Sequence, residues 1–132
     1  QGKWGLLWLT SQSPGHECGS YLHRMHNIHL ALRENSVRFQ SFAILPTRSS
    51  TDECIKQGTE FPDIVLLTGP ESELRDLAMQ FAKAAGLSTS QTDGLYLIDP
   101  LGNLMMRYDT NADFKGILKD LERLLKYSWV GR

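Results

Sequence analysis

The stretch from Gly94 to Tyr108 constrains the fold of this chain most strongly. Leu95 to Ile98 is a short apolar run, which is typical of a strand buried on both faces. Asp99-Pro100-Leu101-Gly102 matches a type I turn, with Asp first, Pro fixing φ at the second position and Gly fourth. Leu104 to Tyr108 then resumes the extended pattern. The two halves are therefore predicted to pair as an antiparallel hairpin.

The rest of the chain alternates predicted strands with predicted helices. Apolar runs predict strands at Trp4 to Leu9, Val37 to Leu45 and Asp63 to Thr68. Apolar residues at helical spacing predict helices at Ser20 to Glu34, Pro70 to Ala85 and Ala112 to Tyr127, with one helical turn near Glu53 to Gln57. The first strand is apolar on both faces and is predicted to be central. This order predicts an α/β fold, a thioredoxin-like sandwich with a mixed sheet of about five strands, helices on both faces and a C-terminal hairpin plus helix.

Size and charge exclude several classes of function. The 132 residues suffice for one domain, 1–132, with a core that needs no metal or disulfide to hold it. Because 14 basic residues balance 15 acidic ones, we expect no binding to nucleic acid or to an anionic membrane surface. No apolar run is long enough to span a bilayer and no signal peptide is recognisable. The chain starts at Gln1, so we interpret it as the soluble part of a membrane-anchored or exported protein, without its leader.

Three segments carry a resemblance to a known family: Gly2 to Leu7, Leu95 to Leu104 and Phe114 to Leu121. Through them the chain resembles the thioredoxin-like Sco/SenC group of cytochrome c oxidase assembly proteins over nearly its whole length. It is closer still to short, membrane-tethered proteobacterial relatives. The resemblance implies a location at the periplasmic face of the bacterial inner membrane. It also implies a respiratory oxidase subunit or assembly factor as partner.

The metal-binding motif of that group is incomplete in this sequence. The Sco group holds copper with a Cys-x-x-x-Cys pair at the start of the first helix and a His just before the hairpin, a soft ligand set suited to Cu(I). Cys18 matches the second cysteine, whereas Pro14 stands at the first and Gln91 near the histidine position. Two of the three ligands are therefore missing. A lone thiol there cannot close the local disulfide that a dithiol oxidoreductase cycles.

The sequence leaves the state of Cys18 open. It can be a leftover cysteine without a role, a nucleophile activated at a helix N-terminus, or one ligand of a copper ion. The second cysteine, Cys54, follows the second predicted strand. A Cys18–Cys54 disulfide is possible in an oxidising compartment, but the sequence does not fix the distance between the two residues.

Four histidines offer further candidate ligands. His23, His26 and His29 recur every three residues, and His16 lies close to Cys18. Imidazoles at i and i+3 can chelate zinc or copper, so Cys18, His16, His23 and His26 are the candidate metal ligands. The alternative interpretation is a solvated helix face that titrates near neutral pH. No catalytic carboxylate pair, Ser-His-Asp arrangement or phosphate-binding glycine loop stands out.

These observations favour a redox-inactive thioredoxin-like domain that binds no cofactor and assists respiratory oxidase assembly through protein contacts. One alternative is a copper metallochaperone that uses Cys18 and nearby histidines. Another is an enzyme, a single-cysteine thiol oxidoreductase or peroxidase, with Cys18 as its catalytic residue.

Overall fold

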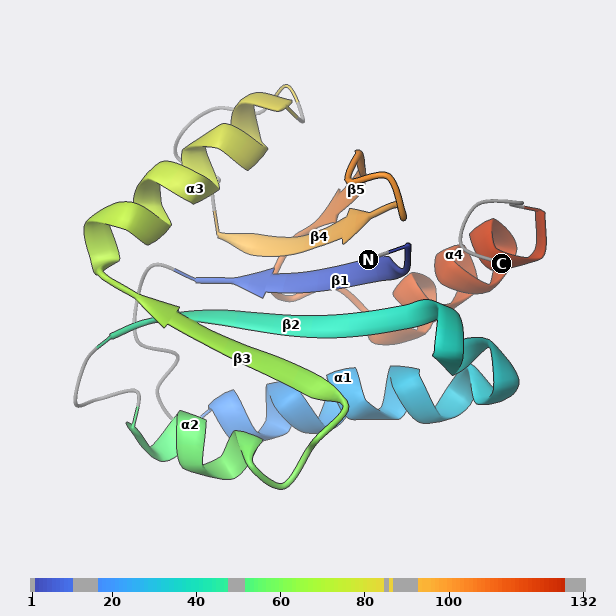
Figure 1. The fold of residues 1–132 in the computed structure, drawn as a ribbon, viewed down its shortest axis with the longest axis horizontal. Coiled ribbons are helices and arrows are strands. Elements are labelled where there is room, and N and C mark those ends of the chain that lie inside the picture. Colours follow the sequence, from blue (N-terminus) through green and yellow to red (C-terminus); the bar gives the residue numbers. More distant parts are fainter. Residues whose placement is uncertain (1, 11–16, 48–51, 85, 87–92, 128–132) are drawn as a thin grey trace.

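The structure is a computed structural model that describes residues 2–10, 17–47, 52–84, 86 and 93–127. Figure 1 shows its elements in chain order. They are β1 (Trp4–Leu9), α1 (Cys18–Ala31), the 3-10 helix η2 (Arg33–Arg38), β2 (Phe39–Pro46), α2 (Asp52–Gly58), β3 (Ile64–Gly69), α3 (Glu71–Ala84), β4 (Gly94–Ile98), β5 (Leu104–Tyr108) and α4 (Phe114–Tyr127).

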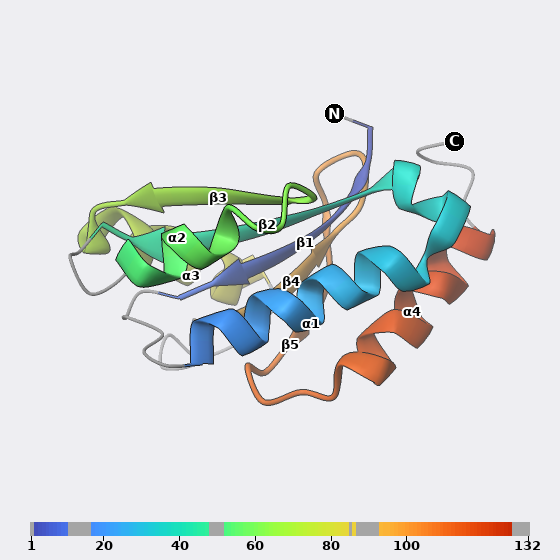
Figure 2. The same cartoon turned by 90° about the horizontal axis from the view of Figure 1, so that it is seen from below.

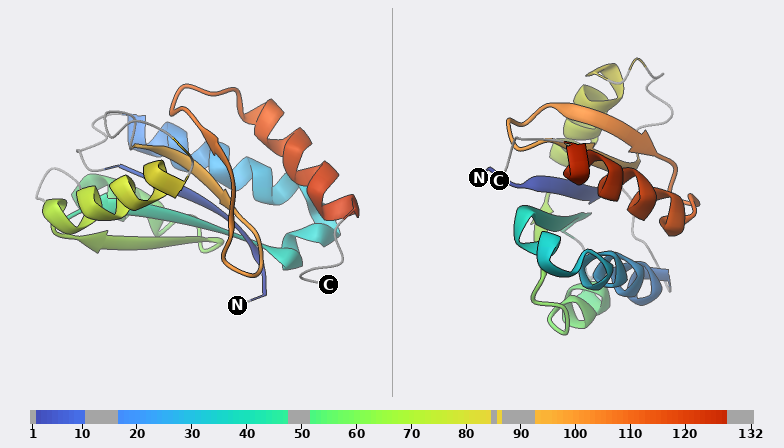
Figure 3. Two further views of the ribbon diagram at one scale, coloured as in Figure 1. Left: turned by 90° about the horizontal axis from the view of Figure 1, so that it is seen from above. Right: turned by 90° about the vertical axis from the view of Figure 1, so that its right-hand side faces the viewer.

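The five strands form one mixed sheet in the order β3-β2-β1-β4-β5. β1 pairs in parallel with β2 and antiparallel with β4, and β2 pairs in parallel with β3. β4 and β5 form the predicted antiparallel hairpin. The central place of β1 and the mixed sheet are both confirmed. Helices α1, α2 and α4 cover one face of the sheet, and α3 covers the other (Figures 2 and 3).

The larger hydrophobic core lies between the sheet and helices α1, α2 and α4. The predicted apolar stripe of α1 supplies Leu22, Met25 and Ile28, which are at most 3% exposed. The stripe of α4 supplies Ile117, Leu121 and Leu125, which are at most 1% exposed. A smaller core beneath α3 contains Leu9, Ile44, Leu74, Ala78 and Tyr96. Helical spacing in the sequence therefore identified the buried faces of these helices correctly.

The turn of the hairpin has the predicted chemistry. The N–H of Gly102 donates to the carbonyl of Asp99 at 2.9 Å, which closes the turn. The Asp99 carboxylate accepts the N–H groups of Leu101 at 3.0 Å and Asn103 at 2.8 Å. Gly102 has φ +90°, a conformation that glycine adopts without a steric penalty.

The structure corrects several predicted boundaries. α1 begins at Cys18 and ends at Ala31, and the next residues form η2 instead of continuing the helix to Glu34. Arg33 has φ +52°, a left-handed conformation that ends an α-helix. Val37 belongs to η2 and is 72% exposed, so β2 begins only at Phe39. The single helical turn expected near Glu53 is a complete short helix, α2.

Candidate functional site

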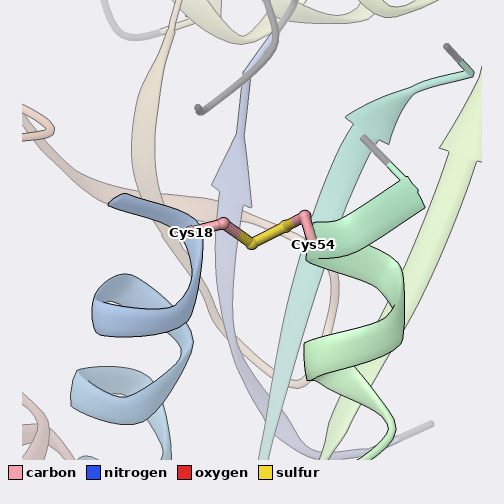
Figure 4. The surroundings of a disulfide bond; sticks show 2 residues. All are labelled: Cys18 and Cys54. Atoms are coloured by element: carbon pink, nitrogen blue, oxygen red, sulfur yellow. A yellow bond between two sulfur atoms is a disulfide. The ribbon is translucent and has the colours of Figure 1, made fainter. Parts of the chain in front are cut away.

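The candidate site lies at the carboxyl end of the central strand, where α1 begins. Cys18 is the first residue of α1, and its Sγ is bonded to the Sγ of Cys54 in α2 (Figure 4). The two Cα atoms are 5.5 Å apart, a usual separation for a disulfide, although the residues are 36 positions apart in sequence. The pairing that the sequence left open is thus present, and neither cysteine of the chain is free.

Both halves of the disulfide are buried. Cys18 is 2% exposed and Cys54 is 3% exposed, and both belong to the larger core. Thiol–disulfide exchange requires a thiolate to reach one of the two sulfur atoms, so this burial protects the bond. In the disulfide form Cys18 also carries no thiolate, the species that attacks a substrate or binds a metal.

The local sequence places Cys54 against the start of α1. Asp52 and Glu53 occupy the first turn of α2, where carboxylates favour the positive end of the helix dipole. Cys54 and Gly58, four residues apart, form the buried side of this helix. A Cβ atom on Gly19 would lie 2.7 Å from Oε1 of Gln57, so α1 and α2 pack closely beside the disulfide.

The other residues of the predicted metal site are not brought together. Pro14, His16 and Gln91 lie outside the described residues. His23 is exposed on α1, as expected for a solvated face. Within the described part of the chain, no three His, Cys, Asp or Glu side chains are grouped so that they could hold a metal ion.

His26 is only partly solvated, because its side chain is 25% exposed and makes contacts beyond α1. Its Nδ1 lies 2.8 Å from Oδ1 of Asp63, the residue that precedes β3, and its ring lies 5.0 Å from that of Phe61. The second carboxylate oxygen of Asp63 is buried without a hydrogen-bond partner. This side of α1 packs against the 61–63 segment, a contact that the helical spacing of α1 alone does not reveal. Asp63 had not been identified as a site residue.

A cavity of about 450 Å³ lies between the end of β1, the first turns of α1 and residues 110–111. Trp8, Tyr21 and Arg24 line it, and the Tyr21 hydroxyl donates to the carbonyl of Thr110 at 2.9 Å. Burial raises the pKa of Tyr21, Arg24 opposes the rise, and Glu17 adds to it. Tyr21 is therefore a protonated hydrogen-bond donor at neutral pH. The sequence pattern placed Tyr21 beside the apolar stripe but gave no signal for this cavity.

A family model described as "Transmembrane-like, thioredoxin-like, C-terminal domain" matches residues 4–128. Among curated proteins, none matches the chain significantly. None of the helices in the described ranges combines the length and apolar character needed to cross a bilayer.

Several solved structures share the fold. Yeast Sco1 with copper bound has a TM-score of 0.69 and 22% identity, with 96% of this chain and 80% of that chain covered. Arabidopsis thaliana ScoI with copper bound has a TM-score of 0.62 and 21% identity, with 93% of this chain and 86% of that chain covered. BsSco has a TM-score of 0.64 and 17% identity, with 96% of this chain and 82% of that chain covered. It is a member of the Sco family of cytochrome c oxidase assembly proteins, and a disulfide switch was identified in it. The predicted thioredoxin-like fold and its likeness to Sco proteins are confirmed at the level of the fold.

Proposed function

The chain belongs to the transmembrane-like, thioredoxin-like C-terminal domain family, and from this premise we propose that it is a redox-inactive accessory domain in respiratory oxidase assembly. It acts through protein contacts and not through a dithiol cycle. The observation that carries this proposal is the state of Cys18, the motif cysteine that remains. It is bonded to Cys54, a partner from another helix, and both residues are at most 3% exposed.

We further propose that the domain faces the periplasm and is tethered to the inner membrane by a segment outside this sequence. A disulfide persists in an oxidising compartment such as the periplasm and is rare in the cytosol. The family description, which includes the word transmembrane-like, supports the tether.

The redox part of the proposal is tested by following the disulfide in the native protein. We expect no alkylatable thiol before reduction and two after reduction in denaturant. At 1 mM dithiothreitol the native disulfide should persist while insulin, mixed with it as an internal control, is reduced. The purified protein should also not accelerate insulin reduction by dithiothreitol. Rapid reduction of the native disulfide together with catalysis of insulin reduction would identify an oxidoreductase and refute the proposal.

The assembly part is tested in the source bacterium. Deletion of the gene should lower cytochrome c oxidase activity, and a plasmid copy should restore it. A copy that carries Cys18→Ala and Cys54→Ala should restore it equally well, at a growth temperature where the variant accumulates to the same level. Unchanged oxidase activity after deletion of the gene would refute the assembly role. If the double alanine copy failed to restore oxidase activity, the cysteines would be shown to act in that role.

One specific observation favours a second candidate, a copper metallochaperone. Reduction of the bond would leave the sulfur atoms of Cys18 and Cys54 side by side, and two thiolates suit Cu(I). The test is a Cu(I) titration of the reduced protein against a chromogenic chelator. One tightly bound Cu(I), lost in Cys18→Ala and retained in His23→Ala and His26→Ala, would favour a two-thiolate chaperone. Loss in the histidine variants as well would favour a site that includes those residues.

A further inference from the structure

The guanidinium group of Arg24 packs against two aromatic rings and has no acidic partner among the described residues. Its Cζ lies 5.0 Å from the centre of the Tyr21 ring and 4.9 Å from that of the Phe114 ring. The two rings meet edge to face at 5.3 Å. Nε of Arg24 is buried and lacks a hydrogen-bond partner, and no carboxylate in the described part of the chain forms an ion pair with this residue. Arg24 also lines the groove described next, so its positive charge can be reached by a carboxylate bound there.

Arg24 stands at the head of a groove between α1 and the start of α4. The groove has a volume of about 550 Å³, within the range of ligand-binding clefts. Ile28 and Ala31 of α1 and Leu118 of α4 line its apolar part. This part therefore suits an aliphatic side chain.

The polar residues of the groove are matched to a peptide that carries a negative charge. Asn27 and Asn111 lie on opposite walls, and an amide side chain can both donate to and accept from a peptide backbone. Lys115 adds a second cation at the rim. The one acidic residue of the lining, Asp113, accepts the backbone N–H of Lys115 at 3.0 Å and so caps the N-terminus of α4.

We infer that this groove binds an extended segment of a partner protein, with an acidic side chain at Arg24 and the following aliphatic side chain over Ala31 and Leu118. This inference rests on the proposed function in one respect: the groove supplies a surface for the protein contacts through which the domain is proposed to act. The occupant follows from complementarity: the cationic head of the groove suits an acidic side chain, and its apolar floor suits an aliphatic one. An arginine held by two rings is also pre-oriented, so little side-chain freedom is lost when a carboxylate binds it.

Binding is measured by titration of the ¹⁵N-labelled domain with acetyl-Gly-Glu-Leu-Gly-amide. The matched control peptide carries Gln in place of Glu. The Nε–H signal of Arg24 reports directly on the head of the groove. We expect saturable shifts of this signal and of the backbone amides of residues 27–31 and 111–118. The Gln peptide should bind about 10-fold more weakly or worse, because a hydrogen bond to a charged group contributes more than a neutral one.

Two variants and one control variant complete the test. Arg24→Gln should weaken the Glu peptide by about 10-fold or more, and Lys115→Gln, an exposed position, by a smaller factor. Arg123→Gln, an exposed arginine of α4 outside the groove, should leave binding unchanged. Thermal unfolding midpoints of the variants establish that each is folded. If Arg24→Gln is unfolded, the comparison of the two peptides and the Lys115→Gln result decide.

Three results would overturn the inference: equal binding of the Glu and Gln peptides, unchanged binding by Arg24→Gln, or equal shifts with sodium acetate, which would indicate a small-anion site. These results are distinguishable from failure of the proposed function. If the peptide fails to bind but the gene still restores oxidase activity, only the groove is refuted. If the peptide binds but deletion leaves oxidase activity unchanged, only the assembly role is refuted.

Discussion

The Cys18–Cys54 disulfide should be a major source of stability for this domain. The perturbation is its removal, either by reduction of the wild-type protein or by the double substitution Cys18→Ala and Cys54→Ala. Alanine is preferred over serine because both positions are at most 3% exposed, and a buried hydroxyl without a partner would add its own penalty. Both routes release the same covalent link between α1 and α2.

The expected magnitude follows from the length of chain that the bond closes. For a sequence separation of 36 residues, the loss of chain entropy in the unfolded state corresponds to ~4 kcal/mol at 25 °C. A 132-residue protein has an entropy of unfolding of roughly 280 cal/mol/K near 60 °C. Removal of the bond should therefore lower Tm by about 14 °C.

The assay is thermal unfolding followed by near-ultraviolet circular dichroism, which reports the packing of the buried residues Trp4 and Trp8. Three samples are compared: oxidised wild type, wild type reduced in denaturant and refolded with a phosphine reductant, and the double alanine variant. The last two should unfold at similar temperatures. Addition of the reductant should leave the Tm of the double variant unchanged, which controls for effects of the reductant itself.

Two results would refute this reasoning. If all three samples unfold within ~3 °C of one another, the bond does not restrict the unfolded chain as the loop-length argument requires. If the reduced wild type loses far more stability than the double variant, the loss comes from two buried thiols and not from chain entropy.

Further predictions concern glycines, the histidine contact and the hairpin turn. Gly94→Ala should destabilise the fold by about 1–3 kcal/mol, because its Cβ would lie 2.8 Å from a backbone carbonyl of β5. Gly116 lies within α4, and a Cβ atom there would meet nothing within 4 Å, so Gly116→Ala should stabilise the fold by about 0.5–1 kcal/mol. Urea unfolding of the two variants checks that their effects on stability have opposite signs. A double-mutant cycle with His26→Ala and Asp63→Asn should give a coupling energy of about 1–3 kcal/mol, and additive effects would show that the 2.8 Å contact does not stabilise the fold. Burial of Asp99 opposes its ionisation, but hydrogen bonds from the turn outweigh this and hold the pKa of its carboxyl below the ordinary 3.8. The ionised carboxylate therefore stabilises the fold above pH 3.8, and this stabilisation is lost as the pH falls through the lower pKa of the folded state. Between pH 5 and pH 2.5 the Tm of wild type should therefore fall more than that of Asp99→Asn, and equal falls would contradict the assignment.

The parts of the fold that were predicted correctly depend on neighbours in sequence. The hairpin turn follows from Asp99 and Gly102, whose roles are set within four residues. The buried stripe of α4 follows from helical spacing alone. Helix α1 was predicted to extend too far, because the left-handed conformation of Arg33 carries no clear signal in the sequence.

The candidate site was predicted less well because its contacts join distant segments. The Cys18–Cys54 bond depends on how closely α2 packs against α1, which spacing along the chain does not determine. The contact between His26 and Asp63 depends on the same packing. The contact of Arg24 with the Phe114 ring likewise joins α1 to α4, so no local pattern in the sequence indicates it.

The central position of β1 has a consequence for the order of folding during synthesis. This strand is made before the other strands of the sheet, yet one of its two neighbours, β4, begins only at Gly94. Until the hairpin leaves the ribosome, one edge of β1 exposes unpaired backbone groups, and the core lacks α4. We therefore expect translation products that end before residue 94 to aggregate or to depend on chaperones, even though they contain three of the five strands.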